Sequence, residues 1–171
     1  MPVPGYLTIN GTKQGNISQG AFTADSVGNI WVEGHEDECL VQAFTNGVVQ
    51  PRDPQSGQPT GTRVHKPATF TKVFDKASPL LWQALCAGEI LQLELKFYRT
   101  AQTGQQEHYF SIKWTDCTLV DGQGFFPNCL DPANSNFTHM EDWSFVYRKV
   151  EWTHEKAGTT GSDDWRKPMT A

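Results

Sequence analysis

The chain has 171 residues, of which 37% are hydrophobic and 12% aromatic, and its formal net charge at pH 7 is −5. This length and composition predict one globular domain that spans residues 1–171. The negative charge argues against non-specific nucleic-acid binding, which needs clustered Lys and Arg, and no apolar stretch reaches the roughly 20 residues that cross a bilayer.

Strands are predicted in the first half of the chain at three segments rich in β-branched or aromatic residues. Gly, Asn or Pro bounds each segment, as is typical of strands, and the segments are 6–10, 39–49 and 68–74. The 15 glycines and 10 prolines of the chain also disfavour long helices. The sequence therefore indicates a β-rich protein.

Residues 51–67 form a long connection between the second and third of these strands, and the connection contains four prolines. A connection above about 12 to 15 residues is usually functional, an Ω-loop or disordered. The prolines favour an extended, partly stiff segment. Composition alone leaves two interpretations equally open, an arm that contacts a partner and a loop that is merely solvated.

A single short helix is predicted next. Ser78 can act as its N-cap, Pro79 suits the first helical position, and Gly88 can supply the left-handed stop. Leu81 and Leu85 lie one turn apart and would form the inward-facing stripe of the helix.

Alternation of apolar and polar residues predicts an antiparallel hairpin after the helix. The alternation runs over 91–98 and again over 107–120, and the polar turn 101–105 joins the two segments. A further run, 143–153, is apolar on both faces, so its buried face stays undecided. Many strands with one helix indicate a β-barrel or a sandwich that the helix closes.

The last part of the chain, residues 155–171, is expected to be a polar tail in which Trp165 needs something to pack on. Asp163 and Asp164 are adjacent, and adjacent residues seldom place two carboxylates on opposite sides of one sugar ring, as glycoside hydrolysis requires. We therefore expect both in a solvated acidic tail.

No motif indicates metal, cofactor or nucleophilic chemistry. The five histidines lack H-x-x-x-H or H-x-H spacing, and no nucleophile elbow, P-loop or dinucleotide-binding glycine motif occurs. Residues 35–38 include three carboxylates, but neighbours in an extended segment point to opposite faces, so we expect an acidic loop before a strand. The cysteines are expected to be buried small hydrophobes rather than disulfide or zinc ligands: Cys39, Cys86, Cys117 and Cys129.

Seven segments in a consistent order carry a family resemblance. The two most distinctive, Asp53–Pro59 and Arg63–Pro67, lie in the long connection. The other five are Ala21–Asn29, Gly34–Glu38, Lys96–Thr100, Tyr147–Val150 and Gly161–Trp165. Together they cover about residues 6–167, and they resemble the haemolysin co-regulated protein (Hcp) family.

The resemblance implies a mostly β fold, a two-sheet β-barrel with one short flanking α-helix and a long extended loop. Members of this family are tube proteins of the type VI secretion system. They form hexameric rings, and the rings stack into a tube inside a contractile sheath, with a spike protein at the tip and small effectors in the ring lumen. The resemblance thus implies a structural subunit without cofactor, metal, catalytic site, nucleic-acid partner or membrane insertion.

The start of the chain has neither the basic nor the apolar region of an export signal. The resemblance accounts for this, because such a subunit is cytoplasmic before firing and is then secreted, or injected into a target cell, without a signal peptide. The chain ends at Ala171, so no appended toxic domain is expected.

A ring that repeats one contact needs two complementary surfaces on each subunit, and residues 51–67 are expected to supply one of them. The expected interface residues are Arg52, Asp53, Gln55, Ser56, Gln58, Arg63 and His65. A ring of six subunits of charge −5 would also repel the next ring, so added salt is expected to favour stacking of the rings.

Two other classes of protein stay open. The six tryptophans could form a sugar-stacking platform in a monomeric, lectin-like β-barrel binding module. A small hydrolase could use the same β-scaffold. A native mass separates these alternatives, because a hexamer supports a tube subunit and a monomer supports its rivals.

Overall fold

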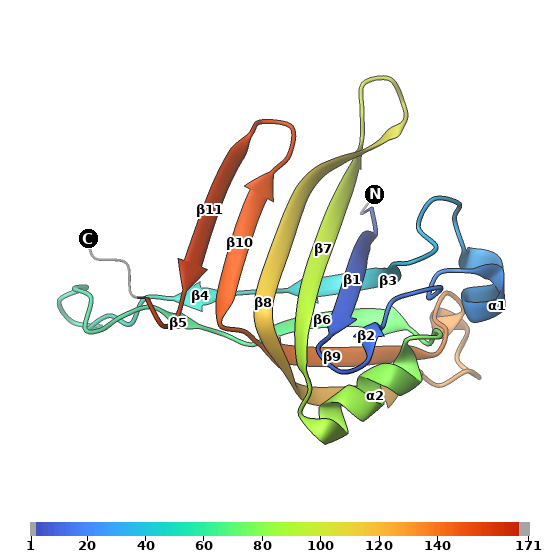
Figure 1. Cartoon of the computed structure of the whole chain (residues 1–171), viewed down its shortest axis with the longest axis horizontal. Helices are drawn as coiled ribbons and strands as arrows, with labels where there is room; N and C mark the ends of the chain where they lie inside the picture. Colours follow the sequence, from blue (N-terminus) through green and yellow to red (C-terminus); the bar gives the residue numbers. More distant parts are fainter. Residues whose placement is uncertain (1–2, 168–171) are drawn as a thin grey trace.

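The computed structural model describes residues 3–167 (Figure 1). The elements follow one another as β1 (Gly5–Gly11), β2 (Gly15–Asn16), α1 (Ala24–Val27), η1 (Gly28–Ile30), β3 (Cys39–Thr45), β4 (Val48–Val49), β5 (Val64–His65), β6 (Ala68–Val73), α2 (Ser78–Ala87), β7 (Ile90–Thr100), β8 (Gln106–Phe125), η2 (Pro132–Asn134), β9 (Met140–Val146), β10 (Lys149–His154) and β11 (Thr159–Asp164). The mostly β fold that the sequence predicts is confirmed.

The main sheet has nine strands and closes on itself. Strands β8, β7, β1, β3, β6 and β9 are neighbours in that order, and β9 pairs back with β8. Strands β10 and β11 extend the sheet from β8, and β4 pairs with β5 in a separate small sheet. In Figure 1, β1, β7, β8, β10 and β11 stand upright while β3, β6 and β9 run across them. These two layers correspond to the predicted two-sheet arrangement.

Strand β8 connects the two layers. One of its edges pairs with β7, while the other pairs with β10 over 110–115 and with β9 over 118–125. Asp116 lies between these two stretches and has a φ of 52°, in the left-handed region that residues other than glycine seldom adopt. The register with β9 also shifts between Leu119 and Asp121, and such irregularities bend a strand. The exchange of partners therefore occurs at a local distortion of β8.

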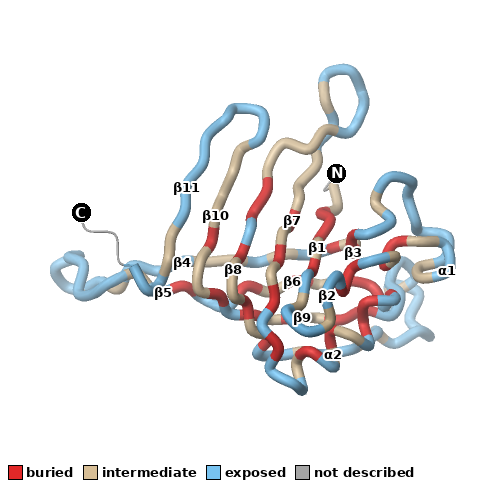
Figure 2. The backbone as a smooth tube through the Cα atoms, viewed as in Figure 1, coloured by how far each residue is buried: buried red, intermediate tan, exposed pale blue. Residues whose placement is uncertain are grey.

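The core lies between the layers and against α2, and Figure 2 shows buried residues along the strands there. Trp114 and Trp143 are fully buried, and the Trp114 ring lies 5.1 Å from that of Phe145. Leu81 is fully buried and Leu85 packs against the same core, as the predicted inward stripe requires. Removal of this apolar surface from water is the main stabilising contribution to such a fold.

Several predicted boundaries were wrong. The predicted strand 39–49 is interrupted after β3, and the run 143–153 divides into β9 and β10, because the chain passes from one layer to the other between them. Ser78 is the first residue of α2 rather than its N-cap, which is Ala77. The Ser78 hydroxyl instead accepts a hydrogen bond from Lys72 Nζ at 2.9 Å. Gly88 does have the predicted left-handed conformation, with φ 63°.

Six elements were not predicted: β2, α1, η1, β5, η2 and β11. The four-residue α1 is too short for a periodic pattern, and β11 lies inside what was expected to be a polar tail. Residues 168–171 of that tail lie outside the described residues. Two of the four cysteines, Cys39 and Cys117, are buried as expected, whereas Cys86 and Cys129 are exposed, which corrects the prediction for them.

Candidate functional site

The long connection, residues 51–67, projects from the body of the molecule as an extended hairpin, which we call the arm (Figure 1). Strands β4 and β5 pair at its base, and Arg52 and Pro59 form a bridge farther out. The Asp53 carboxylate accepts hydrogen bonds from the Ser56 hydroxyl at 2.7 Å and from the Gln55 backbone N–H at 3.1 Å. The bond from Ser56 is the main reason that the pKa of Asp53 is lowered. The tip of the arm is therefore an ordered turn.

An ion pair with strand β11 holds the base of the arm. The Arg63 guanidinium donates to both carboxylate oxygens of Asp163, with Nε···Oδ2 of 2.8 Å and Nη2···Oδ1 of 2.6 Å. Nη2 also donates to the backbone carbonyl of Asp164 at 2.9 Å. Two parallel bonds of this kind fix both distance and orientation. They lower the pKa of Asp163 to about 2 and keep this carboxylate charged.

His65 lies behind this ion pair and is buried. Its Nε2 is 2.6 Å from Asp163 Oδ2, and its Nδ1 is 2.8 Å from the Tyr147 hydroxyl. Burial raises the pKa of Tyr147 to about 12, so the phenol keeps its proton near neutral pH and donates to Asn46 Oδ1 at 3.3 Å. A continuous set of polar contacts thus joins the arm, β11 and the segment between β9 and β10.

Arg148 ties the same segment to the distorted part of β8. Its Nε donates to Asp116 Oδ2 at 2.7 Å, and its Nη1 donates to Asp164 Oδ2 at 2.6 Å. The hydrogen bond from Arg148 lowers the pKa of Asp116. The backbone N–H of Arg148 also bonds to the carbonyl of Thr115 at 3.2 Å. The Arg148 side chain therefore links Asp116, the residue of β8 with the left-handed backbone conformation, to Asp164 at the end of β11.

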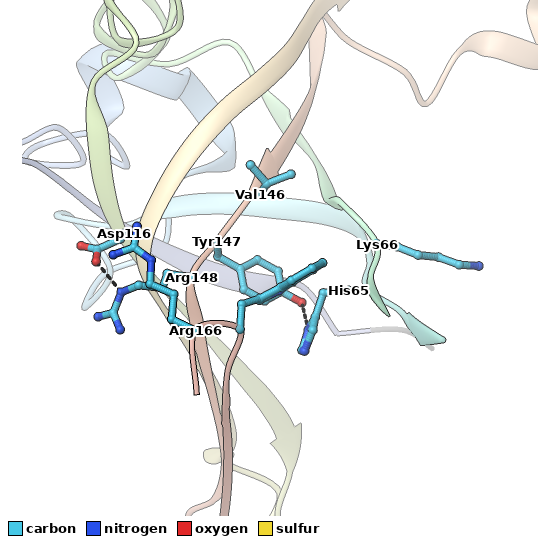
Figure 3. A pocket seen from close by; sticks show the side chains of 8 residues that line it. His65, Lys66, Asp116, Val146, Tyr147, Arg148 and Arg166 are labelled. Carbon is cyan, nitrogen blue, oxygen red and sulfur yellow. Dashed lines mark hydrogen bonds and ion pairs between the residues drawn. The ribbon is translucent and has the colours of Figure 1, made fainter. Parts of the chain in front are cut away.

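An open pocket of about 390 Å³ lies beside these contacts (Figure 3). It is lined by His65, Lys66, Asp116, Val146, Tyr147, Arg148, Trp165 and Arg166. In Figure 3, Lys66 points away from the other side chains, while Asp116 and Arg148 lie together on the opposite side. The Trp165 ring lies 5.2 Å from the His65 ring and keeps 42% of its surface exposed. The His65 ring is therefore the packing partner that we expected Trp165 to need.

The seven expected interface residues fall into two groups. Arg63 and His65 are at the base of the arm and are engaged by β11. The other five lie toward the tip of the arm, where Asp53 orders the turn and the remaining four are exposed: Arg52, Gln55, Ser56 and Gln58. The structure thus separates residues that position the arm from residues that it presents to solvent, and the role of the second group stays a prediction.

Sequence reasoning missed the anchor of the arm. Asp163 and Asp164 were expected in a solvated tail, but both accept hydrogen bonds from arginines, so that expectation was wrong. Asp116 was not singled out at all. Tyr147, Arg148 and the two aspartates do belong to the segments that carry the family resemblance, and this was the one available signal for them.

The acidic run after Gly34 is a loop that leads into β3, as predicted. His35 Nδ1 lies 2.7 Å from Glu38 Oε2, and Lys96 Nζ lies 2.7 Å from Glu38 Oε1. Within residues 3–167, no group of three or more His, Cys, Asp or Glu side chains is arranged to hold a metal ion. No helix in that range is both long enough and apolar enough to traverse a membrane.

The tryptophans do not form one platform for a sugar. Trp114 and Trp143 are fully buried, and Trp82 packs on Trp143 with ring centroids 4.7 Å apart. Trp152 is partly buried against the same core. Trp31 and Trp165 are exposed, but Trp31 follows η1 and Trp165 follows β11, at opposite ends of the molecule (Figure 1). The feature on which the lectin-like alternative depended is therefore missing from the described residues.

Comparison with known proteins gives a consistent result. The family model described as "Type VI secretion system effector, Hcp" matches residues 6–154. The "Major exported protein" of Pseudomonas aeruginosa is 58% identical over 170 residues, which cover 99% of each chain.

Solved structures agree with the sequence comparisons. A structure described as "Crystal structure of Hcp protein" has a TM-score of 0.92 and 45% identity, over 96% of this chain and 98% of that one. The "Secreted protein Hcp3 from Pseudomonas aeruginosa" has a TM-score of 0.81 and 49% identity, over 95% of this chain and 100% of that one.

Proposed function

Because this chain belongs to the Hcp family of the type VI secretion system, we propose that it is the subunit of the secretion tube. In this proposal six copies form a ring, the rings stack into a tube inside the contractile sheath, and a spike protein caps the tip. Small effectors travel in the ring lumen. The protein acts as a structural component, without cofactor or metal, and carries out no catalysis.

The single observation that carries the proposal is the arm. It is a long polar hairpin that extends beyond the body of the molecule, and its base is fixed by the two hydrogen bonds between Arg63 and Asp163. A loop that contacts only solvent needs no such anchor, because no contact with another molecule depends on its conformation. An arm held in one conformation has already lost the entropy that binding a neighbour would otherwise cost.

The proposal also concerns where the protein acts. A relative with 58% identity is described as a major exported protein. We therefore place the subunit in the cytoplasm before firing and outside the cell, or inside a target cell, after the sheath contracts.

Assembly of the whole chain tests the proposal. Sedimentation velocity should show a species of six subunits, and negative-stain electron microscopy should show rings, with stacks at high protein concentration. Removal of residues 55–61 from the arm should abolish stacks or rings while the far-ultraviolet circular dichroism spectrum is retained.

A matched control changes another exposed turn. Replacement of Gln102–Gly104, between β7 and β8, by Gly-Ser-Gly should leave assembly intact. A monomer at all concentrations would refute the proposed function, and unchanged rings and stacks after removal of 55–61 would refute the role of the arm.

A further inference from the structure

Two cationic side chains and two exposed apolar ones line the pocket beside the arm, and of the cations Lys66 points outward from the others (Figure 3). Lys66 and Arg166 are exposed, and neither forms an ion pair with another residue in the described part of the chain. Val146 and Trp165 add apolar surface, with 41% and 42% of their surfaces exposed. We call these four residues the basic pocket. Arg148 lies beside them, but Asp116 and Asp164 already neutralise its charge.

The opposite end of the molecule has a surface with the reverse charge. Three consecutive residues after α1, Ile30–Trp31–Val32, are exposed by 44%, 42% and 50%. Carboxylates flank them, and Trp31, Asp25 and Glu36 line an open pocket of about 390 Å³. We call this surface the acidic corner, and it consists of Asp25, Ile30, Trp31, Val32, Glu33 and Glu36.

The two ends of the loop that carries the acidic corner are held together and against β1. The backbone N–H of Phe22 donates to the carbonyl of Glu36 at 3.1 Å, and that of Gly20 donates to Asp37 Oδ1 at 2.9 Å. The His35 ring stacks on Tyr6, with 3.6 Å between ring centroids. An exposed apolar loop that the fold nevertheless orders is prepared for contact with another molecule.

The two surfaces lie at opposite ends of the long axis in Figure 1, with α1 at one end and β11 and the arm at the other. They therefore cannot meet within one chain, but they can meet between two copies. A contact between different surfaces of identical subunits is heterologous, and it closes into a ring if the rotation divides the circle.

We infer that the acidic corner of one copy docks into the basic pocket of the next copy. The exposed apolar side chains of the two surfaces pack together, and the carboxylates of Asp25 and Glu33 lie opposite the cations of Lys66 and Arg166. This inference rests on the proposed ring, for which it names the two contacting surfaces. The opposite charges also favour this head-to-tail arrangement, because two acidic corners, or two basic pockets, would repel each other.

Charge reversal tests the inference on the full chain. The first variant carries Asp25→Lys and Glu33→Lys, and the second carries Lys66→Glu and Arg166→Glu. None of these four side chains makes a hydrogen bond or ion pair within the described residues. Each variant alone should raise the dissociation constant for association at least tenfold in sedimentation velocity, with an unchanged melting temperature.

The decisive variant carries all four reversals in one chain. It has the net charge of the wild type, its two surfaces have exchanged sign, and association should return to within about threefold of the wild type. Lys13→Glu changes the net charge by −2 at an exposed site outside both surfaces, and this variant should associate like the wild type.

The outcomes separate this inference from the function on which it rests. Rings that persist in both reversal variants would overturn the docking contact and leave the proposed tube subunit intact. Failure of the four-fold reversal to restore rings, when its fold is intact, would also overturn it. A wild-type chain that stays monomeric would refute the ring and, with it, this contact.

Discussion

Arg63 and Asp163 are separated by one hundred residues in the sequence, yet two hydrogen bonds of 2.8 and 2.6 Å join their side chains. This contact ties the arm to β11, and His65 and Arg148 surround it with further polar contacts to Asp163 and Asp164. The arm is thus positioned by a strand that has no apolar pattern of its own. Several consequences of this arrangement can be measured.

Acid should weaken the anchor of the arm over a defined range of pH. Arg63 lowers the pKa of Asp163 to about 2 from its ordinary value of 3.8. A carboxylate with a lowered pKa stabilises the fold above its unfolded-state value, and the stabilisation is lost as the pH falls through the folded-state value.

The variant Asp163→Asn isolates the contribution of this carboxylate to stability, because it has no carboxyl group at position 163. Urea unfolding at pH 5, 4, 3 and 2 should show a loss of stability in Asp163→Asn that is largest at pH 5 and shrinks as the pH falls from about 4 to about 2. A difference from the wild type that stays constant over this range would contradict the prediction.

Arg63→Lys should loosen the arm without unfolding the body. Lysine keeps the charge but cannot form two parallel hydrogen bonds with one carboxylate. Hydrogen exchange should therefore become faster at the amides of Asp53, Gly57 and Lys66, which bond within or beside the arm, and stay unchanged in β7. The matched change Arg99→Lys alters an exposed pair with Glu107 and should leave exchange in the arm as it was.

The buried lysine under α2 should be essential for stability. Lys72 Nζ lies 2.8 Å from Asp75 Oδ1 and 3.2 Å from Glu141 Oε2, and all three side chains are buried. Lys72→Ala leaves two carboxylates without a counter-charge, which costs about 3–5 kcal/mol in comparable buried pairs. Denaturant unfolding should show this loss, and a much smaller one for Lys149→Ala, which removes a more exposed pair with Glu151.

The substitution Gly122→Ala should lower the melting temperature by disturbing the junction of β8 and β9. A Cβ there would lie 2.5 Å from Cζ3 of the buried Trp143 ring, and overpacking of this kind costs about 1–3 kcal/mol. Gly161→Ala in β11 is the matched control, because a Cβ at that position meets nothing within 4 Å. Equal melting temperatures for the two variants would show that the ring of Trp143 can move aside.

Added salt should have opposite effects on the stacking of rings and on the association of subunits within a ring. In the proposed assembly a ring of six chains, each of charge −5, would repel the next ring, so added salt should increase stacking. The proposed contact between the acidic corner and the basic pocket would be attractive, so added salt should weaken association within a ring. Light scattering can follow stacking while sedimentation follows the ring. A yield of stacks that falls steadily with ionic strength would contradict the first expectation.

The sequence was sufficient to predict elements whose side chains repeat a clear pattern. The hairpin of β7 and β8 alternates in apolar character, and its inward residues Leu91, Leu93 and Leu95 are buried. The helix α2 ends at a glycine with positive φ, as predicted. In these cases the local pattern and the tertiary environment favour the same structure.

The anchor of the arm could not be predicted in this way. Strand β11 has the sequence Thr-Thr-Gly-Ser-Asp-Asp, without apolar alternation, and it forms because β10 offers a free edge to pair with. Two adjacent aspartates in a polar segment look solvated until Arg63 and Arg148, distant in sequence, are placed beside them. Such contacts depend on the closed arrangement of strands and not on local sequence.

The distance in sequence between the arm and its anchor also affects how the protein is made. During synthesis the arm leaves the ribosome long before β11 exists, and at about 5–20 residues per second the hundred residues between Arg63 and Asp163 take about 5–20 s. A nascent chain therefore carries an arm without its anchor. In the proposed assembly the anchored arm is therefore presented to another subunit only after β11 has been synthesised, because β11 supplies the anchor.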